Sequence, residues 1–526
     1  MEDTIVLYPS PGRGHLFSMV ELGKQILEHH PSISITIIIS AMPTESISID
    51  DPYFSTLCNT NPSITLIHLP QVSLPPNTSF SPLDFVASFF ELPELNNTNL
   101  HHTLLNLSKS SNIKALIIDF FCSAAFEFVS SRHNIPIYFF YTSGASGLSM
   151  FLHLPILDKI ITKSLKDLDM IIDLHGIPKI PSKEMPPAIS DRSHRVYQYF
   201  VDTAKLMIKS AGVIINTFEL LERRALQAIQ EGKCGAPDER VPPLFCVGPL
   251  LTTSESKSEH ECLTWLDSQP ARSVLFLCFG SMGVFNSRQL RDTAIGLEKS
   301  GVRFLWVVRP PLADSQTQAG KSNEPCLELL LPEGFLERTK DRGFLVNSWA
   351  PQGEILNHGS VGGFATHCGW NSFLEALCAG VPMLAWPLYA EQRMNRIFMV
   401  EEMKVALAFR EAEDDQFVNA AELEERVIEL MNSKKGEAVR ERVQKLREDA
   451  VEAKSDGGSS CIAMAKLAQI LNETDPPNTA GPGLSAGPKA LGFALGMAQA
   501  VRSWLEKGSK MLSSDNRNVH LSVGSW

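Results

Sequence analysis

The sequence has 526 residues, 44% of them hydrophobic, and a formal net charge of −12. A chain of this length is too long for a single core, so two domains of about 200 residues each are expected. The negative charge argues against nucleic acid or an anionic membrane as a partner. The ten cysteines are scattered without C-x-x-C spacing. This pattern predicts free thiols and disfavours a disulfide framework or a zinc site.

The N-terminal region predicts the start of a parallel α/β sheet. A tight Gly/Pro turn, which ends at His15, separates the first strand from the first helix. A second buried strand follows the helix. The expected elements are a strand at 4–8, the turn at 9–15, a helix at 16–28 and a strand at 34–40.

The turn before the first helix contains half of a dinucleotide-binding fingerprint. Gly12 and Gly14 have the required spacing, but Phe17 occupies the third glycine position. The region between Glu28 and Glu45 also contains no acidic residue that could hold a ribose. A nicotinamide-dependent dehydrogenase is therefore a disfavoured alternative. The glycines are interpreted as allowing the backbone and His15 to approach a ligand.

Further apolar runs complete the predicted first sheet, and one of them ends in an acid, Asp119. Carboxyl ends of parallel strands face the ligand crevice in such sheets, so Asp119 is well placed to act. The alternative is that Asp119 only caps a helix, but His15 is also expected at a strand end, which favours the functional interpretation. The remaining strands are expected at 63–69, 114–119, 136–141, 213–217 and 244–247.

Two polar segments of the first half carry weaker predictions. The irregular loop 70–82, with Pro75-Pro76 and Phe80, suits the wall of a pocket. The pair Asp167-x-Asp169 has the spacing of a metal-binding motif, but it lies in a helix-like polar run and is interpreted as a solvated face. No metal site is expected.

A polar stretch at 250–261 is predicted to be the linker between two domains. Beyond it, Ser281 follows a predicted strand and could contact a phosphate. The elements expected there are a helix at 262–268, strands at 273–279 and 303–308, and a polar insertion at 310–325.

The most informative stretch runs from Trp349 to Gln392. It contains an apolar strand at 361–366, the turn H-C-G-W-N-S, and a helix from about Asn371 to Ala379. Gly380-Val381-Pro382 ends that helix, a strand follows at 383–386, and Glu391 opens the next helix.

A polar turn between a strand and a helix start offers unpaired backbone N–H groups to an anion. His367, Asn371 and Ser372 add side-chain donors, so a phosphate or diphosphate is the expected ligand. Trp349 offers a flat face to a base, whereas the side chains that could bind sugar hydroxyls are Trp370, Glu391 and Gln392. An ordinary strand–helix turn with a buried Trp explains single residues, but it does not explain the whole set.

This stretch resembles, nearly position for position, the signature box of plant UDP-dependent glycosyltransferases of family 1. The resemblance in element order extends over residues 4–471, and it implies the GT-B fold, in which two Rossmann-like α/β domains face each other across a cleft. It further implies that Trp349 stacks on uracil, that Ala350 and Gln352 contact it in the plane, and that Glu375 binds the ribose. The same resemblance gives the diphosphate to His367, Asn371 and Ser372, and the sugar to Trp370, Glu391 and Gln392.

Taken with the resemblance, the residues predict a metal-independent, inverting glucosyl transfer without a cofactor. His15 would be the general base, because imidazole titrates near working pH. Asp119 would hold its second nitrogen and stabilise the imidazolium. Gln392 resembles the UDP-glucose version of the box, and Trp370 stands where glucuronate-using relatives often carry Arg. The expected product is a β-O-glucoside.

The acceptor is expected to be a small phenol. Aromatic residues gather near the predicted strand ends, and the N-terminal segment L-Y-P-S-P-G-R-G-H-L resembles the flavonoid and chalcone branch of the family. Core packing explains some of these rings equally well; they are Phe120, Phe121, Phe139, Phe140 and Tyr141. The alternative from another class is a non-catalytic UDP-sugar- or phenol-binding protein, against which the intact His15 and Asp119 argue.

The predicted organisation is an acceptor-binding domain at 1–249, the linker at 250–261 and a UDP-sugar-binding domain at 262–436. A helix at 437–471 is expected to return to the first domain, and the Pro/Gly-rich tail at 472–526 is expected to be disordered. The first residues, M-E-D-T-I-V, have no basic region typical of a secretory signal, and no apolar run is long enough for a membrane span. The chain is therefore expected to be a cytoplasmic monomer.

Overall fold

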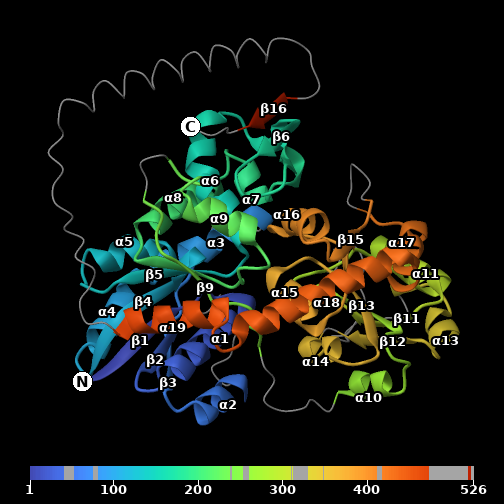
Figure 1. Ribbon diagram of the computed structural model, residues 1–526, viewed down its shortest axis with the longest axis horizontal. Helices are drawn as coiled ribbons and strands as arrows, with labels where there is room; N and C mark the ends of the chain where they lie inside the picture. The colour runs from blue at the N-terminus through green and yellow to red at the C-terminus, as the bar shows by residue number, and fades with distance from the viewer. Residues whose placement is uncertain are drawn as a thin grey trace.

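The computed structural model describes residues 1–40, 52–74, 81–236, 240–252, 260–309, 311, 330–347, 349–410, 417–472 and 519–522. In these ranges the chain forms two halves, each built on a parallel sheet flanked by helices (Figure 1). Two consecutive helices, labelled α18 and α19, run along one side of the molecule from the second half to the first.

The first half contains a seven-stranded sheet with the order β3-β2-β1-β4-β5-β8-β9. All its strand pairs are parallel, and β1 lies between β2 and β4. Strands covered on both faces are near-continuous runs of apolar residues, which is why the sequence pattern located them. The strands are β1 (Glu2–Tyr8), β2 (Ser34–Ile39), β3 (Ile64–His68), β4 (Ser111–Asp119), β5 (Ile137–Tyr141), β8 (Gly212–Ile215) and β9 (Leu244–Cys246).

The helices of the first half connect these strands and cover the sheet. Short 3₁₀ turns occur at η1 (Phe120–Cys122), η2 (Leu165–Asp167) and η3 (Ser182–Glu184). The α-helices are α1 (Arg13–His29), α2 (Pro52–Thr60), α3 (Pro82–Leu95), α4 (Asn97–Leu107), α5 (Ala124–Ser130), α6 (Ala145–Ile160), α7 (Pro187–Ser190), α8 (Arg195–Lys209) and α9 (Arg223–Gln230).

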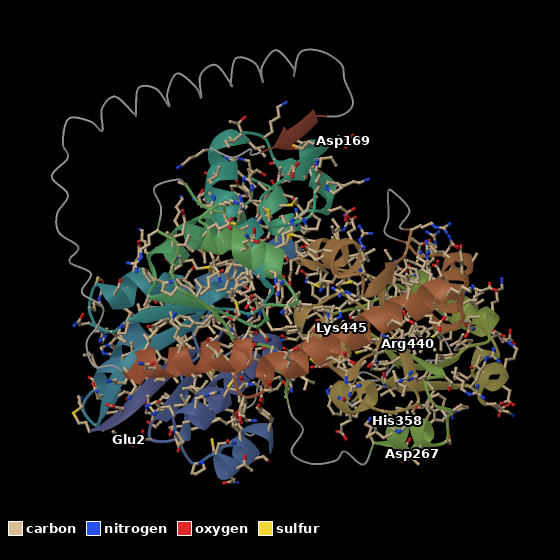
Figure 2. All side chains as sticks on the ribbon, viewed as in Figure 1. Glu2, Asp169, Asp267, His358, Arg440 and Lys445 are labelled. Carbon is tan, nitrogen blue, oxygen red and sulfur yellow. The ribbon has the colours of Figure 1, made fainter. Side chains whose placement is uncertain are left out.

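A small third sheet, in the order β16-β6-β7, involves the tail of the chain. Strands β6 (Met170–Asp173) and β7 (Ile180–Pro181) pair antiparallel, and β16 (Val519–Ser522) pairs with β6 in parallel. The prediction of a disordered tail is therefore wrong for these four residues, because their backbone groups pair with a strand that is remote in sequence. The helix-like run expected around Asp167-x-Asp169 is also wrong, since Asp167 ends η2 and Asp169 stands just before β6. The labelled Asp169 lies at this end of the molecule, beside β16 (Figure 2).

The second half contains a six-stranded parallel sheet with the order β12-β11-β10-β13-β14-β15. The predicted strands at 303–308 and 361–366 are observed with the same limits, whereas β12 and β15 were not expected. The strands are β10 (Val274–Cys278), β11 (Arg303–Val308), β12 (Gly343–Asn347), β13 (Val361–Thr366), β14 (Met383–Ala385) and β15 (Ala406–Ala408).

The helices of the second half surround this sheet. They are α10 (Glu261–Asp267), α11 (Ser287–Ser300), α13 (Phe335–Thr339), α14 (Gln352–Leu356), α15 (Trp370–Ala379), α16 (Gln392–Ile397), which continues into the π-helical turn η4 (Phe398–Glu402), and α17 (Ala420–Asn432).

Two helices, α18 (Lys434–Lys454) and α19 (Ser459–Asn472), replace the single helix expected at 437–471. The break contains Gly457, whose φ of +80° favours glycine because it has no Cβ. Helix α18 stays with the second half, where the Arg440 guanidinium donates to the Gly362 carbonyl at 2.7 Å (Figure 2). Helix α19 packs on α1, β4 and β9 of the first half (Figure 1).

Several predicted features lie outside the described residues. They are Pro75, Pro76 and Phe80 of the pocket loop, residues 253–259 of the linker, most of the insertion at 310–325, and the tail at 473–518 and 523–526. The domain limits proposed from the sequence stay a prediction.

Removing residues 473–526 should leave folding and turnover largely intact, because α19 is retained. Met464, Leu467 and Leu471 of α19 are buried in the same core cluster as strands β1 and β2. A chain ending at Gly458 should be insoluble or strongly destabilised, since each such side chain contributes about 1.5–3 kcal/mol on burial. Thermal unfolding and turnover of the two truncated proteins test this. If the protein ending at Asn472 is inactive or insoluble, the tail packs in a way that the enzyme requires.

Candidate functional site

The first part of the site lies where β1 and β4 end side by side. The turn after β1 leads into α1, whose helical hydrogen bonding begins at Gly12: the carbonyl of Gly12 accepts the backbone N–H groups of His15 and Leu16 at 3.0 Å. His15 therefore lies in the first turn of α1. This corrects the expectation of a helix starting at Leu16, and it fixes the ring on a rigid element.

His15 and Asp119 are in direct contact. Nδ1 of His15 lies 2.9 Å from Oδ2 of Asp119 and 3.2 Å from the Thr142 hydroxyl. Asp119 is fully buried at the end of β4, and its other oxygen accepts the Phe121 N–H at 3.0 Å. The two interpretations weighed from sequence are thus both true: one oxygen caps η1 and the other holds the imidazole. With its proton on Nδ1, facing the carboxylate, the neutral ring presents Nε2 as a base.

The protonation of His15 is set by opposing effects. Burial lowers the pKa of the imidazole, but the charge and hydrogen bond of Asp119, with a smaller contribution from Glu391, raise it above the usual value. The side chain keeps 25% of its surface exposed, so the ring is not fully enclosed. A raised pKa strengthens the ring as a base, although it also moves the pH at which the neutral form appears upward.

The second part of the site is the turn between β13 and α15, in which His367 is buried. Burial lowers the pKa of His367 to about 4, so the ring is neutral near pH 7. The His367 ring has room because residues 280 and 369 are glycines. A Cβ on Gly280 would lie 2.6 Å from Nε2 of His367, and a Cβ on Gly369 would lie 2.4 Å from the same atom. Cys368, the next residue, has a φ of +65°, which is unusual for a residue other than glycine.

The His367 ring carries an unsatisfied buried group. Its Nδ1 is buried and has no hydrogen-bond partner among the described residues. An unsatisfied buried polar atom at a helix start is a feature that a bound anion or water explains. Ser281, which follows Gly280 after β10, is exposed, and its carbonyl accepts the Arg309 guanidinium. The turn thus fits the expected diphosphate.

Trp370 and Asn371 at the start of α15 make contacts with the first half of the molecule. The indole N–H of Trp370 donates to the Asn216 carbonyl at 2.7 Å. The Asn371 amide donates to the Gly14 carbonyl at 3.1 Å and accepts the Ser18 hydroxyl at 3.3 Å. The sequence predicted that the Trp370 N–H binds sugar hydroxyls. In the structure the indole has only one N–H, and it is already donated to Asn216. Asn371 keeps one N–H for a diphosphate.

The residues expected around the nucleotide gather at α14 and α15. The Gln352 amide donates to the Ser372 hydroxyl at 3.0 Å and to the Glu375 carboxylate at 2.6 Å. Burial raises the pKa of Glu375, and the bond from Gln352 opposes this rise. Trp349 is 62% exposed, with the His260 ring 6.2 Å away, whereas Ala350 is buried. An exposed indole beside polar side chains can accept a stacked base.

The segment before α16 carries Glu391 and Gln392. The Gln392 carbonyl oxygen accepts the backbone N–H groups of Leu388 and Tyr389, both at 2.9 Å. Its N–H₂ end is therefore the part available to a sugar. Ala390 has a φ of +52°, and Asn395 on α16 donates to the Cys368 carbonyl at 3.0 Å. These contacts join the segment to the turn after β13.

Sequence reasoning missed several contributors to the site. The Thr142 hydroxyl contacts His15, Asn216 and Ser18 contact the start of α15, and Asn395 joins α16 to the turn. Glu222 is buried and accepts the first N–H groups of α6 from Ala145 and Ser146, at 2.7 and 2.8 Å. Asn216 could have been found, because it is a polar residue directly after a buried strand.

Comparison with known proteins identifies the family of this chain. A family model for UDP-glucoronosyl and UDP-glucosyl transferase matches residues 233–446. An anthocyanidin 5,3-O-glucosyltransferase from a Rosa hybrid cultivar is 50% identical over 485 residues, covering 90% of this chain and 99% of that protein. The chain belongs to the plant UDP-glycosyltransferase family. Isoflavone 7-O-glucosyltransferase 1 of Glycine max is 47% identical to this UDP-glycosyltransferase, over 90% of this chain and all of that protein.

Solved structures extend the match to the whole architecture. Phytolacca americana UGT2 complexed with UDP-2fluoro-glucose and pterostilbene is 34% identical to this UDP-glycosyltransferase, with a TM-score of 0.78. The matched region covers 90% of this chain and 100% of the Phytolacca chain. A UDP-glucosyltransferase from Polygonum tinctorium, in complex with 3,4-dichloroaniline, has a TM-score of 0.80 at 33% identity, over 90% of this chain and 99% of that one. The predicted family and its GT-B fold are confirmed, and the dehydrogenase and non-catalytic alternatives are dropped.

Two further features of the described residues concern metal ions and membranes. In these ranges, no group of three or more His, Cys, Asp or Glu side chains is arranged to hold a metal ion. Likewise, none of the helices that the structure describes combines the length and apolar character that crossing a bilayer requires.

Replacing Asp119 with Asn should shift the pH dependence of the UDP-glycosyltransferase in a defined direction. The base must be neutral, so kcat/KM rises as pH passes upward through the His15 pKa. Because Asp119 raises that pKa, its loss should move the acidic limb to lower pH, while turnover falls as the ring loses its holder. Rates from about pH 5 to 9 measure this. Asp202→Asn, an exposed carboxylate paired with Lys205, is the control and should shift nothing. If the acidic limb of Asp119→Asn stays at the parent pH, that limb does not report the titration of His15.

Proposed function

We propose that the protein transfers glucose from UDP-glucose to the hydroxyl of a small phenolic acceptor, giving a β-O-glucoside. The observation that carries the proposal is the His15–Asp119 pair at 2.9 Å, placed beside the start of α15. Asn371 contacts the carbonyl of Gly14, the residue before His15. A base on one half and an anion-binding turn on the other are therefore adjacent, as direct sugar transfer requires.

In the proposed reaction, Nε2 of His15 takes the proton of the acceptor hydroxyl. The oxygen forms a bond to the anomeric carbon as the bond from that carbon to the UDP oxygen breaks, and attack from the opposite face inverts the configuration. The resulting imidazolium is stabilised by Asp119. The charge that develops on UDP would be met by the N–H groups at the start of α15 together with Ser281, His367, Asn371 and Ser372. No metal or cofactor has a step in this scheme; UDP-glucose is the donor substrate.

The remaining proposed donor contacts involve residues in or next to α14, α15 and α16. We propose that Trp349 stacks on the uracil, with Ala350 and Gln352 at its edge and Glu375 at the ribose. Glu391 and the N–H₂ end of Gln392 would bind the glucose hydroxyls. Trp370 is proposed to act through its ring, because its N–H is donated to Asn216.

The acceptor is proposed to lie against aromatic rings next to His15. The Phe121 ring packs edge-on against His15 at 5.3 Å, and Phe89 lies 5.4 Å from Phe121. Relatives named for anthocyanidin and isoflavone support a flavonoid-like phenol. Pterostilbene in the Phytolacca structure is likewise a phenol.

We further propose that the enzyme works as a monomer in the cytoplasm. The base and the anion-binding turn come from one chain, so a second copy is not needed to complete the site. The nine described cysteines are free thiols, and burial raises the pKa of several of them, Cys246 to about 12. Such thiols suit a reducing compartment.

His15→Ala should lower turnover by roughly 10²–10⁴-fold, the usual contribution of a positioned general base. UDP affinity should change little, because the nucleotide contacts come from the other half of the molecule. Asp119→Ala should lower the rate less, since Asp119 orients the ring without taking the proton. The double variant should lose less than the product of the two single losses.

Turnover of a simple phenol and calorimetric UDP binding, measured on the same folded samples, check this. His101→Ala is a control, because His101 of α4 pairs with His133, which follows α5, and neither residue contacts His15 or Asp119. A His15→Ala enzyme that stays within about threefold of the parent rate would end the proposed mechanism.

UDP-glucose should be preferred over UDP-galactose and UDP-glucuronate in direct competition. Glu391 and Gln392 offer a neutral sugar hydrogen-bond partners, and the Glu391 carboxylate repels a uronate. Gln392→His should weaken glucose use, because an imidazole cannot accept both the Leu388 and Tyr389 N–H groups. Product masses from the mixed donors give the ratio. Preferred glucuronate transfer, or an unchanged donor profile in Gln392→His, would contradict the sugar-binding role.

A further inference from the structure

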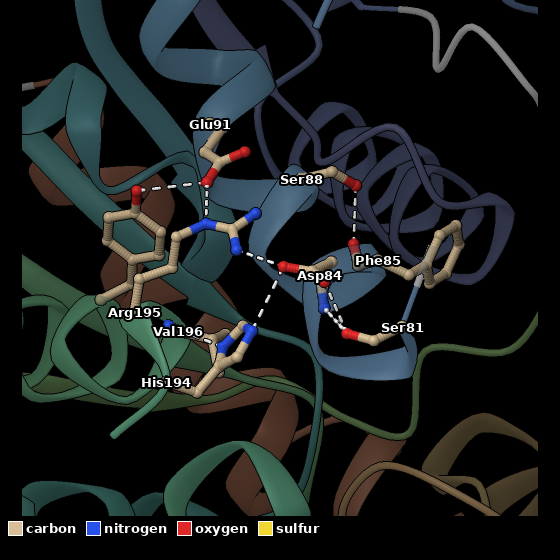
Figure 3. Close-up of polar contacts among 9 residues, drawn as sticks. Ser81, Asp84, Phe85, Ser88, Glu91, His194, Arg195 and Val196 are labelled. Atoms are coloured by element: carbon tan, nitrogen blue, oxygen red, sulfur yellow. Dashed lines mark hydrogen bonds and ion pairs between the residues drawn. The ribbon is translucent and has the colours of Figure 1, made fainter. Parts of the chain in front are cut away.

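A buried carboxylate, Asp84, ties helix α3 to the start of α8 (Figure 3). Ser81 caps α3: its hydroxyl accepts the Asp84 N–H at 3.1 Å and donates to the Asp84 carboxylate at 2.6 Å. The other carboxylate oxygen pairs with the Arg195 guanidinium and lies 3.2 Å from Nε2 of His194. One acid thus holds the first turns of two helices together.

His194 has a defined tautomer in this contact. Its Nδ1 accepts the Val196 backbone N–H at 3.3 Å, which caps α8. A neutral ring that accepts at Nδ1 carries its proton on Nε2, and that proton is donated to Asp84. The cap of α8 and the bond to α3 are therefore parts of one arrangement.

The Arg195 guanidinium reaches a second acid on α3. Its Nε donates to Glu91 at 2.6 Å, and the Tyr199 hydroxyl donates to the same oxygen at 3.4 Å (Figure 3). Asp84 and Glu91 are seven residues apart, so they lie about two turns apart on the same side of α3. A single planar group that pairs with both acids fixes the rotation of α3 about its own axis.

Other positions of α3 carry the rings that approach the base. Phe85 and Phe89 are 5.2 Å apart, and Phe89 lies 5.4 Å from Phe121, whose ring is 5.3 Å from His15. A Cβ on Gly12, three residues before His15, would lie 3.2 Å from the Phe89 ring. Phe89 and Leu92 form a small apolar cluster separate from the two large cores, with Val72, Leu74, Phe85 and Phe121 packed against it.

Small rotations of α3 would move these rings by chemically significant amounts. A helix with its side chains has a radius of about 5–6 Å, so a rotation of about 10° displaces a ring by about 1 Å. A misplacement of about 1 Å from a remote change can lower a rate 10²-fold. The contacts between α3 and α8 are therefore placed to control how a phenol meets His15.

We propose that Asp84, Glu91 and Arg195 form a clamp that sets the acceptor's orientation and thereby selects which hydroxyl is glucosylated. These are positioning residues: they act through Phe85, Phe89 and Phe121 and do not touch the reacting atoms. The inference rests on the proposed function, in which His15 is the base for a phenolic acceptor.

The test uses Arg195→Gln, because this side chain is 41% exposed and its replacement should leave the fold intact. With quercetin as the probe, the clamp requires the KM for the acceptor to rise at least threefold and the ratio of glucoside regioisomers to change at least threefold. The KM for UDP-glucose should stay within twofold. Glu91→Gln should shift the regioisomer ratio in the same direction, and Arg195→Lys should recover part of it.

Arg192→Gln is the matched control. Arg192 also belongs to the start of the α8 region, but it pairs with Asp158 of α6 at 2.8 Å and not with the acids of α3. It should leave the regioisomer ratio unchanged. If Arg195→Gln lowers the melting temperature while the ratio and the acceptor KM stay at parent values, the clamp is structural only and the proposal is overturned.

A phenol with a single hydroxyl separates this proposal from the proposed function. Turnover of this phenol by the parent enzyme, and the loss of that turnover in His15→Ala, test the role of His15 as the base. They do not test the clamp, because a single hydroxyl leaves no choice of position. A parent that turns over the simple phenol while Arg195→Gln keeps the parent regioisomer ratio would overturn the clamp and leave the proposed function standing. Failure of the simple phenol to react at all would overturn both.

Discussion

The first part of the site, at the ends of β1 and β4, depends on the hydrogen bonds made by Asp119, whose carboxylate is fully buried. A buried charge is strongly destabilising unless it is paired and hydrogen-bonded. One oxygen accepts a backbone N–H of η1 and the other meets the His15 imidazole. The end of β4, the aromatic turn after it and the first turn of α1 are therefore fixed relative to one another. The same contacts place the Phe121 ring beside His15, so the orientation of His15 and the packing of the aromatic rings around it have a common cause.

The second part of the site, at the start of α15, depends on glycines that let bulky rings pack close to the backbone. Glycines on both sides of His367 allow its ring to lie at the helix start, and Trp370 fits against Gly144 of the first half, where a Cβ would lie 2.4 Å from the indole. Consecutive residues of α15 then contact the β8 end and the α1 start. The start of α15, which is the proposed diphosphate site, is thus also held at a fixed distance from His15.

Local pattern was sufficient for much of this arrangement. The strands β11 and β13 are continuous apolar runs with clear ends, and their limits were predicted correctly. His15 and Asp119 could be paired because both were predicted at carboxyl ends of strands in one parallel sheet, and the structure makes those strands neighbours. Hydrogen-bond partners that only tertiary packing brings together could not be predicted from local pattern. The bond from Trp370 to Asn216 spans 154 residues, and the break before α19 replaces a helix that the periodicity alone would continue. Strands β12 and β15 were not predicted; they are the two edge strands of their sheet, and β12 is only partly buried.

The position of α19 also bears on how this chain is made. Its Ser460 hydroxyl donates to the Gly248 carbonyl at 2.6 Å, across 212 residues of sequence. At about 5–20 residues per second, a ribosome needs roughly 10–40 s to synthesise that interval. During this time the first sheet has emerged while the face that α19 covers is still open to solvent. The domain that is translated first is consequently completed last, and its apolar surface needs protection from aggregation until synthesis of the second domain has finished.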